Sequence, residues 1–331
     1  MSENSKRLRI GVSGIGSIGF RHTRLLSQLG GVDIFVADPV ESHRKAAMEL
    51  PGVAASTDSF DRLLEYGLDG LIIAAPDQFH ISQAEQACRK GAAVLIEKPI
   101  AENVTQCDSL ITTIKEAKAK VLVGYPLRHN SVFLKAKEMV DRGIIGEIVS
   151  FQILLGSYNT LVAAKNRFSQ TEINKLFVDY SHEWDYLQWF LGKVKRVVGI
   201  SHTSGNREKK QSPNVVNALF DMESGVSGTA HLDYILSPGT RAFTMIGDEG
   251  VLTINATKTS ITLQKYEDDF ERVYDIAETF DSMMLKQIEH FLDVINSDIE
   301  CKVTVDDGIN ALRVAGALIM SIERNTWQEV Y

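Results

Sequence analysis

The sequence is poor in cysteine and proline. Its three cysteines, Cys88, Cys107 and Cys301, are widely spaced and form no Cys-x-x-Cys pair, so they suggest neither disulfides nor a zinc site. Only 7 prolines occur in 331 residues, and there is no internal repeat or low-complexity segment. This composition is typical of an ordinary globular chain, long enough for two domains with full cores.

Long hydrophobic runs are also missing. No stretch approaches a membrane span, and the polar residues 1–7 are not followed by an apolar run that resembles a signal peptide. The formal net charge of −8 argues weakly against a nucleic acid or an anionic membrane surface as a partner. We therefore expect a cytoplasmic protein with no nucleic-acid or membrane partner.

The stretch from Leu8 to Asp38 has the order of a dinucleotide-binding unit. A short apolar strand precedes a glycine-rich turn, and a helical pattern, a second apolar strand and an acidic residue follow it. In such sites the glycines allow a tight turn, close approach of the backbone to the pyrophosphate, and packing of the helix on the strand. The acidic residue, about 20 residues further on, accepts hydrogen bonds from the ribose. The predicted cofactor-binding residues here are Gly14, Gly16, Ser17, Ile18, Gly19 and Asp38. A glycine turn without a ligand is the weaker alternative.

Strands and helices alternate over residues 8–124. Apolar runs predict strands over 70–75, 93–96 and 121–124, besides the two already named, and helical patterns lie over 42–50, 58–66, 81–90 and 105–118. Ser42 is a candidate N-cap for the first of these helices. The alternation predicts an α/β fold whose first domain, residues 1–124, is a doubly wound parallel sheet of Rossmann type covered on both faces.

The pattern changes after residue 124. A helix is predicted over 131–142, and strands over 147–153, 194–202, 215–221, 227–234, 241–246, 251–255 and 260–266. Glycine-containing turns between neighbouring strands indicate hairpins. Two helices, near 282–295 and 306–322, close the chain. We expect a second α/β domain, residues 125–331, with an open, mostly antiparallel sheet.

Polar residues gather just after the predicted parallel strands. They are Asp77, His80, Glu97, Lys98, Tyr125, Arg128 and His129. Ligands of open parallel sheets bind beyond these strand ends. Lys98 is held in an extended backbone by the proline that follows it, and a lysine partly desolvated beside a nicotinamide could act as acid or base. A solvated Glu97–Lys98 loop pair is an equally strong alternative at this point.

A second polar cluster lies in the segment from Asp179 to Gly192. On a helix, residues 179, 182, 185 or 186, and 189 share one face. A histidine held by a carboxylate suits proton transfer, and His182 has Asp179 and Asp185 one turn away on either side. No third ligand group with recognised spacing supports a metal, so none is predicted. A capping Asp179 with a hydrogen-bonded core His182 is the alternative.

These motifs together resemble the Gfo/Idh/MocA family of sugar and polyol oxidoreductases, and the resemblance covers nearly the whole chain. It rests on the glycine motif, Ala75-Pro76-Asp-Gln-Phe-His80, Glu97-Lys98-Pro99, Tyr125-Pro-Leu-Arg128, Gly143-Ile-Ile-Gly146-Glu-Ile, Asp179-Tyr-Ser-His182-Glu-Trp-Asp185 and Ile246-Gly-Asp-Glu-Gly250. The resemblance implies a nicotinamide cofactor, and Asp38 predicts NAD over NADP, because its carboxylate would accept hydrogen bonds from a ribose hydroxyl and repel a 2′-phosphate. It also implies a homo-oligomer, a dimer or a tetramer, formed through the second-domain sheet.

The resemblance also implies roles for individual residues. Lys98 would contact the reacting hydroxyl, with His182 and Asp179 completing the catalytic group. Further cofactor contacts would come from Pro76, His80, Glu97, Lys98 and Arg128. Substrate contacts would come from Lys98, Tyr125, Asp179, His182 and Asp185. Many members place the acid four residues before the histidine, but that position is Val178 here, and this variant resembles members acting on amino sugars or related acids.

The predicted function is therefore hydride transfer between NAD and a hydroxyl-bearing carbon of a cyclic polyol, sugar, amino sugar or sugar acid. Two alternatives remain open. A catalytically silent NAD-binding regulator of the same fold would need the glycines but not Lys98 and His182. An NAD-recycling glycosidase of the same fold would also transfer a hydride to NAD. It would then recycle that hydride and release no NADH.

Overall fold

A computed structural model describes residues 7–157, 180–203, 213–268, 270–297 and 299–331. The chain forms two compact units, which are described separately. Unit 1 comprises Met1–His129 and Thr279–Ile309, and unit 2 comprises Asn130–Glu278 and Asn310–Tyr331. The sequence analysis placed a single boundary near residue 124. In the structure the chain leaves unit 1 after His129 and returns to it for the segment that carries the first of the two closing helices.

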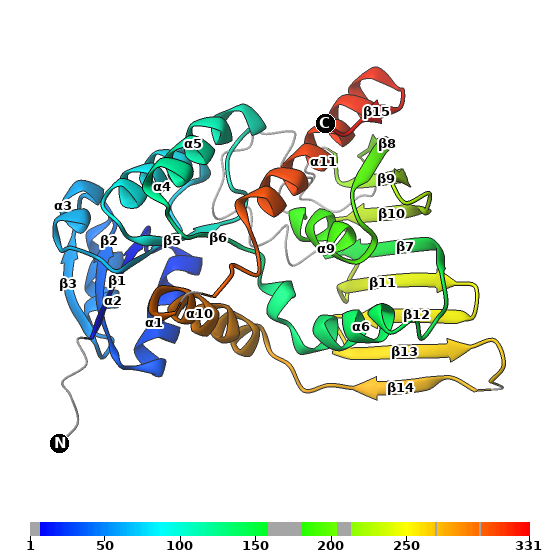
Figure 1. Ribbon diagram of the computed structural model, residues 1–331, viewed down its shortest axis with the longest axis horizontal. Helices are drawn as coiled ribbons and strands as arrows, with labels where there is room; N and C mark the ends of the chain where they lie inside the picture. Colours follow the sequence, from blue (N-terminus) through cyan, green and yellow to red (C-terminus); the bar gives the residue numbers. More distant parts are fainter. Residues whose placement is uncertain (1–6, 158–179, 204–212, 269, 298) are drawn as a thin grey trace. The chain divides into compact units, whose positions relative to one another are not determined.

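Unit 1 is built on a six-stranded sheet in the order β3-β2-β1-β4-β5-β6 (Figure 1). Its strands are β1 Leu8–Ser13, β2 Val32–Ala37, β3 Val53–Thr57, β4 Gly70–Ile73, β5 Ala93–Glu97 and β6 Val121–Gly124. Every pair is parallel, which confirms the predicted Rossmann-type sheet. The sequence analysis missed β3, because this outermost strand is only partly buried and lacks a continuous apolar run.

Helices cover both faces of this sheet. They are α1 Ser17–Leu29, α2 Glu41–Met48, α3 Phe60–Glu65, α4 His80–Arg89, α5 Cys107–Ala117 and α10 Phe280–Asn296, with short 3-10 turns η1 Asp77–Phe79, η2 Val104–Gln106 and η3 Pro126–His129. Helices α1, α2 and α10 contribute to one core cluster, while α4 and α5 pack together on the other face (Figure 1). The predicted cap at Ser42 was wrong: α2 begins at Glu41 after Val40, and no side chain caps it.

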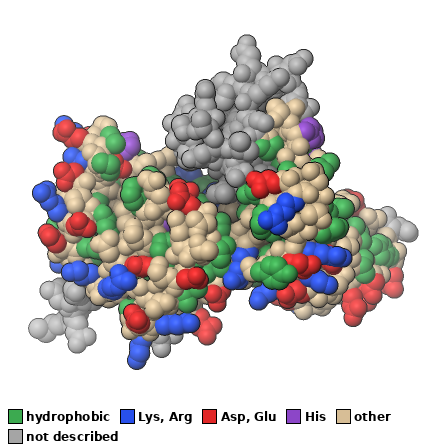
Figure 2. Space-filling model, turned by 90° about the horizontal axis from the view of Figure 1, so that it is seen from above, with side chains coloured by type: hydrophobic (Ala, Val, Ile, Leu, Met, Phe, Trp, Pro, Cys, Tyr) green, Lys and Arg blue, Asp and Glu red, His purple; other side chains and the backbone are tan. Residues whose placement is uncertain are grey.

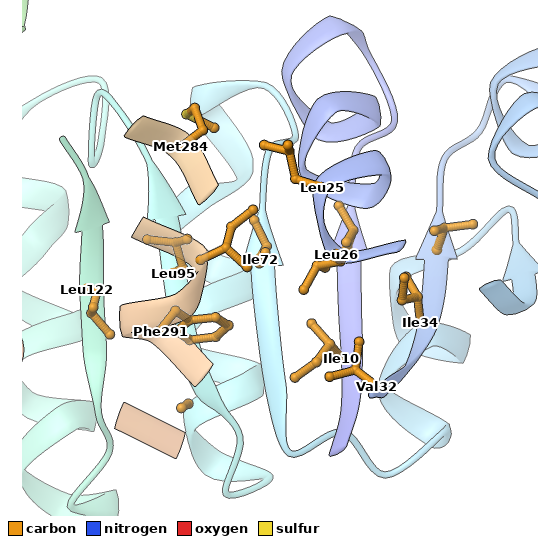
Figure 3. Close-up of a cluster of buried hydrophobic side chains, with 14 of the residues drawn as sticks. Ile10, Leu25, Leu26, Val32, Ile34, Ile72, Leu95, Leu122, Met284 and Phe291 are labelled. Carbon is orange, nitrogen blue, oxygen red and sulfur yellow. The ribbon is translucent and has the colours of Figure 1, made fainter. Parts of the chain in front are cut away.

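The core under α1 and α10 combines segments far apart in the sequence. Figure 3 shows side chains from the central strands, such as Ile10, Ile72 and Leu95, facing Leu25 of α1 and Phe291 of α10. All five are at most 1% exposed. A strand in the middle of a parallel sheet is buried on both faces, so its apolar side chains need a cover on each side. Helix α10 supplies part of that cover.

Unit 2 contains a nine-stranded sheet in the order β14-β13-β12-β11-β7-β10-β9-β8-β15. Its strands are β7 Ile148–Gly156, β8 Val194–His202, β9 Val215–Met222, β10 Ser227–Asp233, β11 Thr240–Gly247, β12 Gly250–Asn255, β13 Ser260–Lys265, β14 Arg272–Asp275 and β15 Gln328–Glu329. Only the β7–β10 pair is parallel among these described strands, so the mostly antiparallel sheet is confirmed. The sequence analysis missed β14 and β15, which are short and lie at the edges.

The described helices of unit 2 are α6 Ser131–Asp141, α9 Ser181–Leu191 and α11 Val305–Arg324, which begins in unit 1 and continues into unit 2. Aromatic side chains of α9 pack on the sheet; the rings of Tyr186 and Phe243, for example, lie 5.1 Å apart. On the opposite face of the strands Leu154, Ile200 and Leu219 are between 41% and 64% exposed. Nowhere in the described chain is a helix long and apolar enough to cross a membrane.

The α10 contact with the unit 1 core can be tested by truncating one side chain. Phe291→Ala removes a fully buried ring and leaves a cavity, so the free energy of unfolding should fall by about 3–5 kcal/mol. Met48→Ala on α2, where the side chain is 42% exposed, should change it by less than about 0.5 kcal/mol. Urea denaturation of both variants gives the comparison. Equal stability of the two would contradict a structural role of α10 in this core.

Candidate functional site

The register of the parallel strands brings the predicted site segments of unit 1 to one edge of its sheet. Ser13 pairs with both Ala37 and Ile73, and Glu97 pairs with Gly124. The glycine-rich turn, Asp38 and the segments that follow β4, β5 and β6 therefore all begin at the carboxyl ends of adjacent strands. This edge is where open parallel sheets bind their ligands.

The glycine-rich turn has the shape that a pyrophosphate needs. Gly14 has φ +82°, and a Cβ atom there would lie 2.6 Å from the carbonyl oxygen of Ala74. A Cβ on Gly19 would lie 1.7 Å from the carbonyl oxygen of Gly14, so α1 packs too closely for any side chain. A Cβ on Gly16 would meet no atom within 4 Å. The turn is thus closed on its protein side and open at Gly16, the residue before the first turn of α1, where a phosphate would meet free N–H groups.

Asp38 ties the end of β2 to this turn. Its carboxylate accepts hydrogen bonds from the backbone N–H groups of Ile15, at 2.6 Å, and Val40, at 2.8 Å. The residue is only 7% exposed. A carboxylate has about four acceptor sites, so these two bonds leave capacity for ribose hydroxyls. The predicted ribose contact stays a prediction, and the structure adds a second task, the ordering of the glycine turn.

His80 connects the segments that follow β4 and β5. It starts α4 and is 2% exposed, with Nδ1 2.7 Å from the carbonyl oxygen of Pro99 and Nε2 2.8 Å from that of Ala75. Pro76, next to this link, is exposed. Both ring nitrogens of His80 therefore contact the backbone, and they hold two of the strand-end segments against each other. The predicted cofactor contacts of Pro76 and His80 stay predictions.

The segment after β5 carries a buried acid followed by a half-buried lysine. Glu97 is 8% exposed, and its Oε1 lies 2.7 Å from Nε2 of His22, on α1. Its Oε2 accepts the backbone N–H of Lys98 at 3.3 Å. The alternative of a solvated Glu97–Lys98 loop pair is therefore wrong as far as Glu97 is concerned, because its side chain is buried. His22 was not among the predicted site residues, because a histidine on the buried face of a helix does not indicate its distant partner.

The segment after β6 carries a buried arginine. Arg128 is 8% exposed and donates a hydrogen bond from Nη2 to Oδ1 of Asp307, at 2.9 Å, at the start of α11. Asp307 also accepts bonds from the backbone N–H and the hydroxyl of Thr304, both at 2.7 Å. The sequence analysis missed Asp307. The Thr304-x-x-Asp307 pattern marks a helix start and is a visible signal, but it does not reveal the distant arginine.

Two neighbours of Arg128 are buried as well. Tyr125 is 1% exposed, and its predicted substrate contact stays a prediction. His129 is 3% exposed, with its ring centroid 5.4 Å from that of His290. Burial lowers the pKa of His129 to about 3, and the positive charges of His290, Lys302 and Arg128 act in the same direction. His129 is therefore a neutral imidazole at physiological pH and adds no positive charge beside Arg128.

In unit 2 the described part of the second polar cluster lies on α9. His182 is half-buried in the first turn, and Asp185 is 1% exposed. Asp179 lies outside the described residues, so its position relative to His182 stays a prediction. The sequence analysis missed Glu183, which is fully buried with Oε1 2.9 Å from Nε of Arg241. Burial, followed by the charge of Glu183, raises the pKa of the Tyr186 hydroxyl well above its ordinary value.

The described residues contain no group of three or more histidine, cysteine or acidic side chains placed to hold a metal ion. On the face shown in Figure 2, lysine and arginine side chains are interspersed with aspartate and glutamate. Among the coloured residues of that face, no large area carries side chains of only one charge.

The parallel sheet, the open glycine turn and the acid at the end of β2 define unit 1 as a dinucleotide-binding domain of Rossmann type. The family model described as "Oxidoreductase family, NAD-binding Rossmann fold" matches residues 8–125, and the "GFO/IDH/MocA C-terminal domain" matches residues 133–253. The chain belongs to the Gfo/Idh/MocA family. It is an NAD-dependent dehydrogenase, and NAD is its cofactor.

Relatives extend over nearly the whole chain. An NAD(+)-dependent scyllo-inositol 2-dehydrogenase of Bacillus subtilis is 24% identical over 92% of this chain and 93% of its own length. The rhizopine catabolism protein MocA of Rhizobium meliloti is 24% identical over 96% of both chains. A scyllo-inositol dehydrogenase from Lactobacillus casei, crystallised with NAD(H) and scyllo-inositol, has the same fold, with a TM-score of 0.84 at 22% identity over 98% of this chain and 99% of its own.

The different surroundings of two glycines predict different effects of alanine. Gly16→Ala places a methyl group in open space, so the fold should stay intact while the affinity for NAD falls at least ~10-fold, because the methyl group occupies the approach to the pyrophosphate. Gly19→Ala should lose stability instead, since its methyl group collides with the turn. Thermal denaturation and fluorescence titration with NAD separate the two effects. Unchanged NAD affinity in folded Gly16→Ala would show that the cofactor does not bind at this turn.

Proposed function

We propose that the chain oxidises a hydroxyl-bearing carbon of a cyclic polyol or sugar derivative and that Lys98 engages the reacting hydroxyl. The observation that carries this proposal is the position of Lys98. It follows β5 at the carboxyl edge of the unit 1 sheet, the same edge as the open glycine turn, in a segment held by contacts of Glu97 and Pro99. Inositol dehydrogenases among the relatives support the substrate class.

The reaction separates into a hydride and a proton. NAD, when bound, supplies the hydride acceptor. Lys98 takes the hydroxyl proton on Nζ when it is neutral, and His182 shares this transfer. Because groups around one hydroxyl titrate as a unit, the proposal assigns the proton to the Lys98–His182 pair and not to either residue alone. Asp179 orients His182, and Asp185 binds a further hydroxyl.

Arg128 has a positioning task in this proposal. Its guanidinium is buried and held by Asp307, so the group keeps one orientation. A side chain that is already ordered loses less conformational freedom when a ligand binds beside it. Holding carbon and ring at near-attack distance contributes a large part of the barrier reduction in such reactions.

The substrate class can be narrowed by a spectrophotometric screen of the purified protein with NAD. Inositols are the first candidates because of the relatives, and amino sugars and uronic acids follow because of the Asp179 variant. NADH formation with an inositol supports the proposal. Substrate turnover with bound cofactor and no net NADH release would favour the NAD-recycling glycosidase, and NAD binding with no turnover at all would favour the regulator.

The chemical step is tested by Lys98→Ala and His182→Ala. Removal of a general acid or base typically lowers kcat by ~10²–10⁴-fold. NAD affinity should survive in His182→Ala and change by only a few-fold in Lys98→Ala. Lys90→Ala, an exposed lysine at the end of α4, is the control and should behave like the parent. If both test variants turn over within a few-fold of the parent, these residues do not perform the proton transfer.

We also propose a homo-oligomer, at least a dimer, formed through the face of the unit 2 sheet opposite α9, which carries exposed apolar side chains. Along β9 and β10 the side chains alternate between a buried face and a more exposed one. The exposed face carries Leu154 on β7, Leu219 on β9 and Ile200 on β8, within the strand order β7-β10-β9-β8. Exposed apolar side chains gathered on one face mark protein–protein interfaces.

Two leucines of unit 2 with nearly equal exposure test this assembly. Leu154 lies on the sheet face and is 41% exposed, while Leu134 lies on α6 and is 40% exposed. Leu154→Glu should dissociate the oligomer, because it places a charge in an apolar interface, and Leu134→Glu should not. Light scattering gives the masses. A parent protein that is only a 36.7 kDa monomer at micromolar concentration would refute the assembly.

A further inference from the structure

A buried histidine and a buried glutamate connect the cofactor-binding helix to the strand that carries Lys98. His22 lies on α1 and is completely buried, and its Nε2 lies 2.7 Å from Oε1 of Glu97. The same helix begins at the glycine turn, and Thr23, next to His22, donates its hydroxyl to the carbonyl oxygen of Gly19. One helix therefore contacts both the glycine turn and the residue before Lys98.

The hydrogen bonds of His22 indicate its protonation state. Its Nδ1 is buried and has no hydrogen-bond partner among the described residues. In the imidazolium form, or in the tautomer with the proton on Nδ1, this position would be a buried N–H without an acceptor, which native structures rarely tolerate. The neutral tautomer with the proton on Nε2 avoids that cost and donates to Glu97. Oε1 of Glu97 is then the acceptor of this hydrogen bond.

The Glu97 carboxylate has little room to move. A Cβ atom on Gly124, the partner of Glu97 in the neighbouring strand, would lie 3.1 Å from its carboxylate carbon and both oxygens. The carboxylate thus lies directly against the backbone of β6 on one side and against His22 on another. Its second oxygen accepts the N–H of Lys98.

We propose that His22 is a positioning residue for Lys98 and acts through Glu97. By donating Nε2–H to the buried carboxylate, His22 keeps Glu97 in one place, and Glu97 in turn fixes the backbone from which Lys98 extends. Because His22 lies on the helix that begins at the glycine turn, the pair also fixes the distance between that turn and Lys98. This inference rests on the proposed function of Lys98.

Three single variants and one double variant test the pair. His22→Phe keeps an aromatic ring but removes the donor, so kcat should fall roughly 10- to 100-fold, the loss that a misplacement of about 1 Å can cause. The substrate KM and the NAD affinity should stay within a few-fold of the parent. His22→Gln restores an N–H at a similar reach and should recover most of kcat.

Glu97→Gln removes the charge and should lower kcat as His22→Phe does. The double variant His22→Phe/Glu97→Gln should have a kcat no lower than that of the poorer single variant.

A spectroscopic measurement on NAD-free protein is independent of activity. The ¹⁵N spectrum of histidine-labelled protein should show His22, assigned by its absence in His22→Gln, as the neutral tautomer protonated at Nε2. An imidazolium signal, or a proton on Nδ1, would overturn the assignment of the pair.

Asp69→Asn is the matched control for a merely structural effect. Asp69 accepts the backbone N–H of Arg9 at 2.8 Å, at the opposite edge of the same sheet. This variant should lower the melting temperature and leave kcat within about 2-fold of the parent, since Asp69 lies at the amino ends of the strands and the site at their carboxyl ends. If Lys98→Ala is inactive while folded His22→Phe keeps the parent's kcat, or His22→Gln restores nothing, the role of His22 is refuted and the proposed function stands. If Lys98→Ala is itself active, the proposed function fails.

Discussion

The burial of a parallel sheet on both faces is the constraint on which unit 1 depends. Its strands β4, β5 and β6 are short, completely buried and apolar except for Glu97 at the end of β5, and such strands are stable only between two layers of helices. The chain meets this requirement with α10, which comes from far along the sequence and places Phe291 in the core. Parallel pairing has a second consequence: all carboxyl ends of the strands meet at one edge. The same constraint thus produces both the core and the place of the site.

Three charged groups at this edge are buried, and each has a specific partner. Asp38 accepts two backbone N–H groups, Glu97 contacts His22, and Arg128 contacts Asp307. A buried charge is costly unless it is paired and hydrogen-bonded. These partners therefore keep charged side chains in fixed positions where a mobile, solvated group would otherwise lie. Side chains that are already in fixed positions before binding can position the cofactor and the substrate.

Local patterns in the sequence were sufficient for much of the fold. The apolar runs of β1, β4, β5 and β6, the glycine turn and the alternating strands of unit 2 were all predicted, because each is a signal within a short window. Strands β3, β14 and β15 were not predicted, because these edge strands are short or only partly buried. The return of α10 to unit 1 was not predicted either, because the apolar face of a helix does not indicate which sheet the helix covers.

The sequence by itself determined which residues follow the parallel strands, and with them the family, the cofactor and the candidate Lys98. The parallel direction of the strands follows from their alternation with helices, so these residues could be placed at one edge without a structure. Only the tertiary structure decided which partner each buried charge has. His22 and Glu97 are 75 residues apart, and Arg128 and Asp307 are 179 apart. Pairs at such distances are formed by packing, and no spacing rule in the chain encodes them.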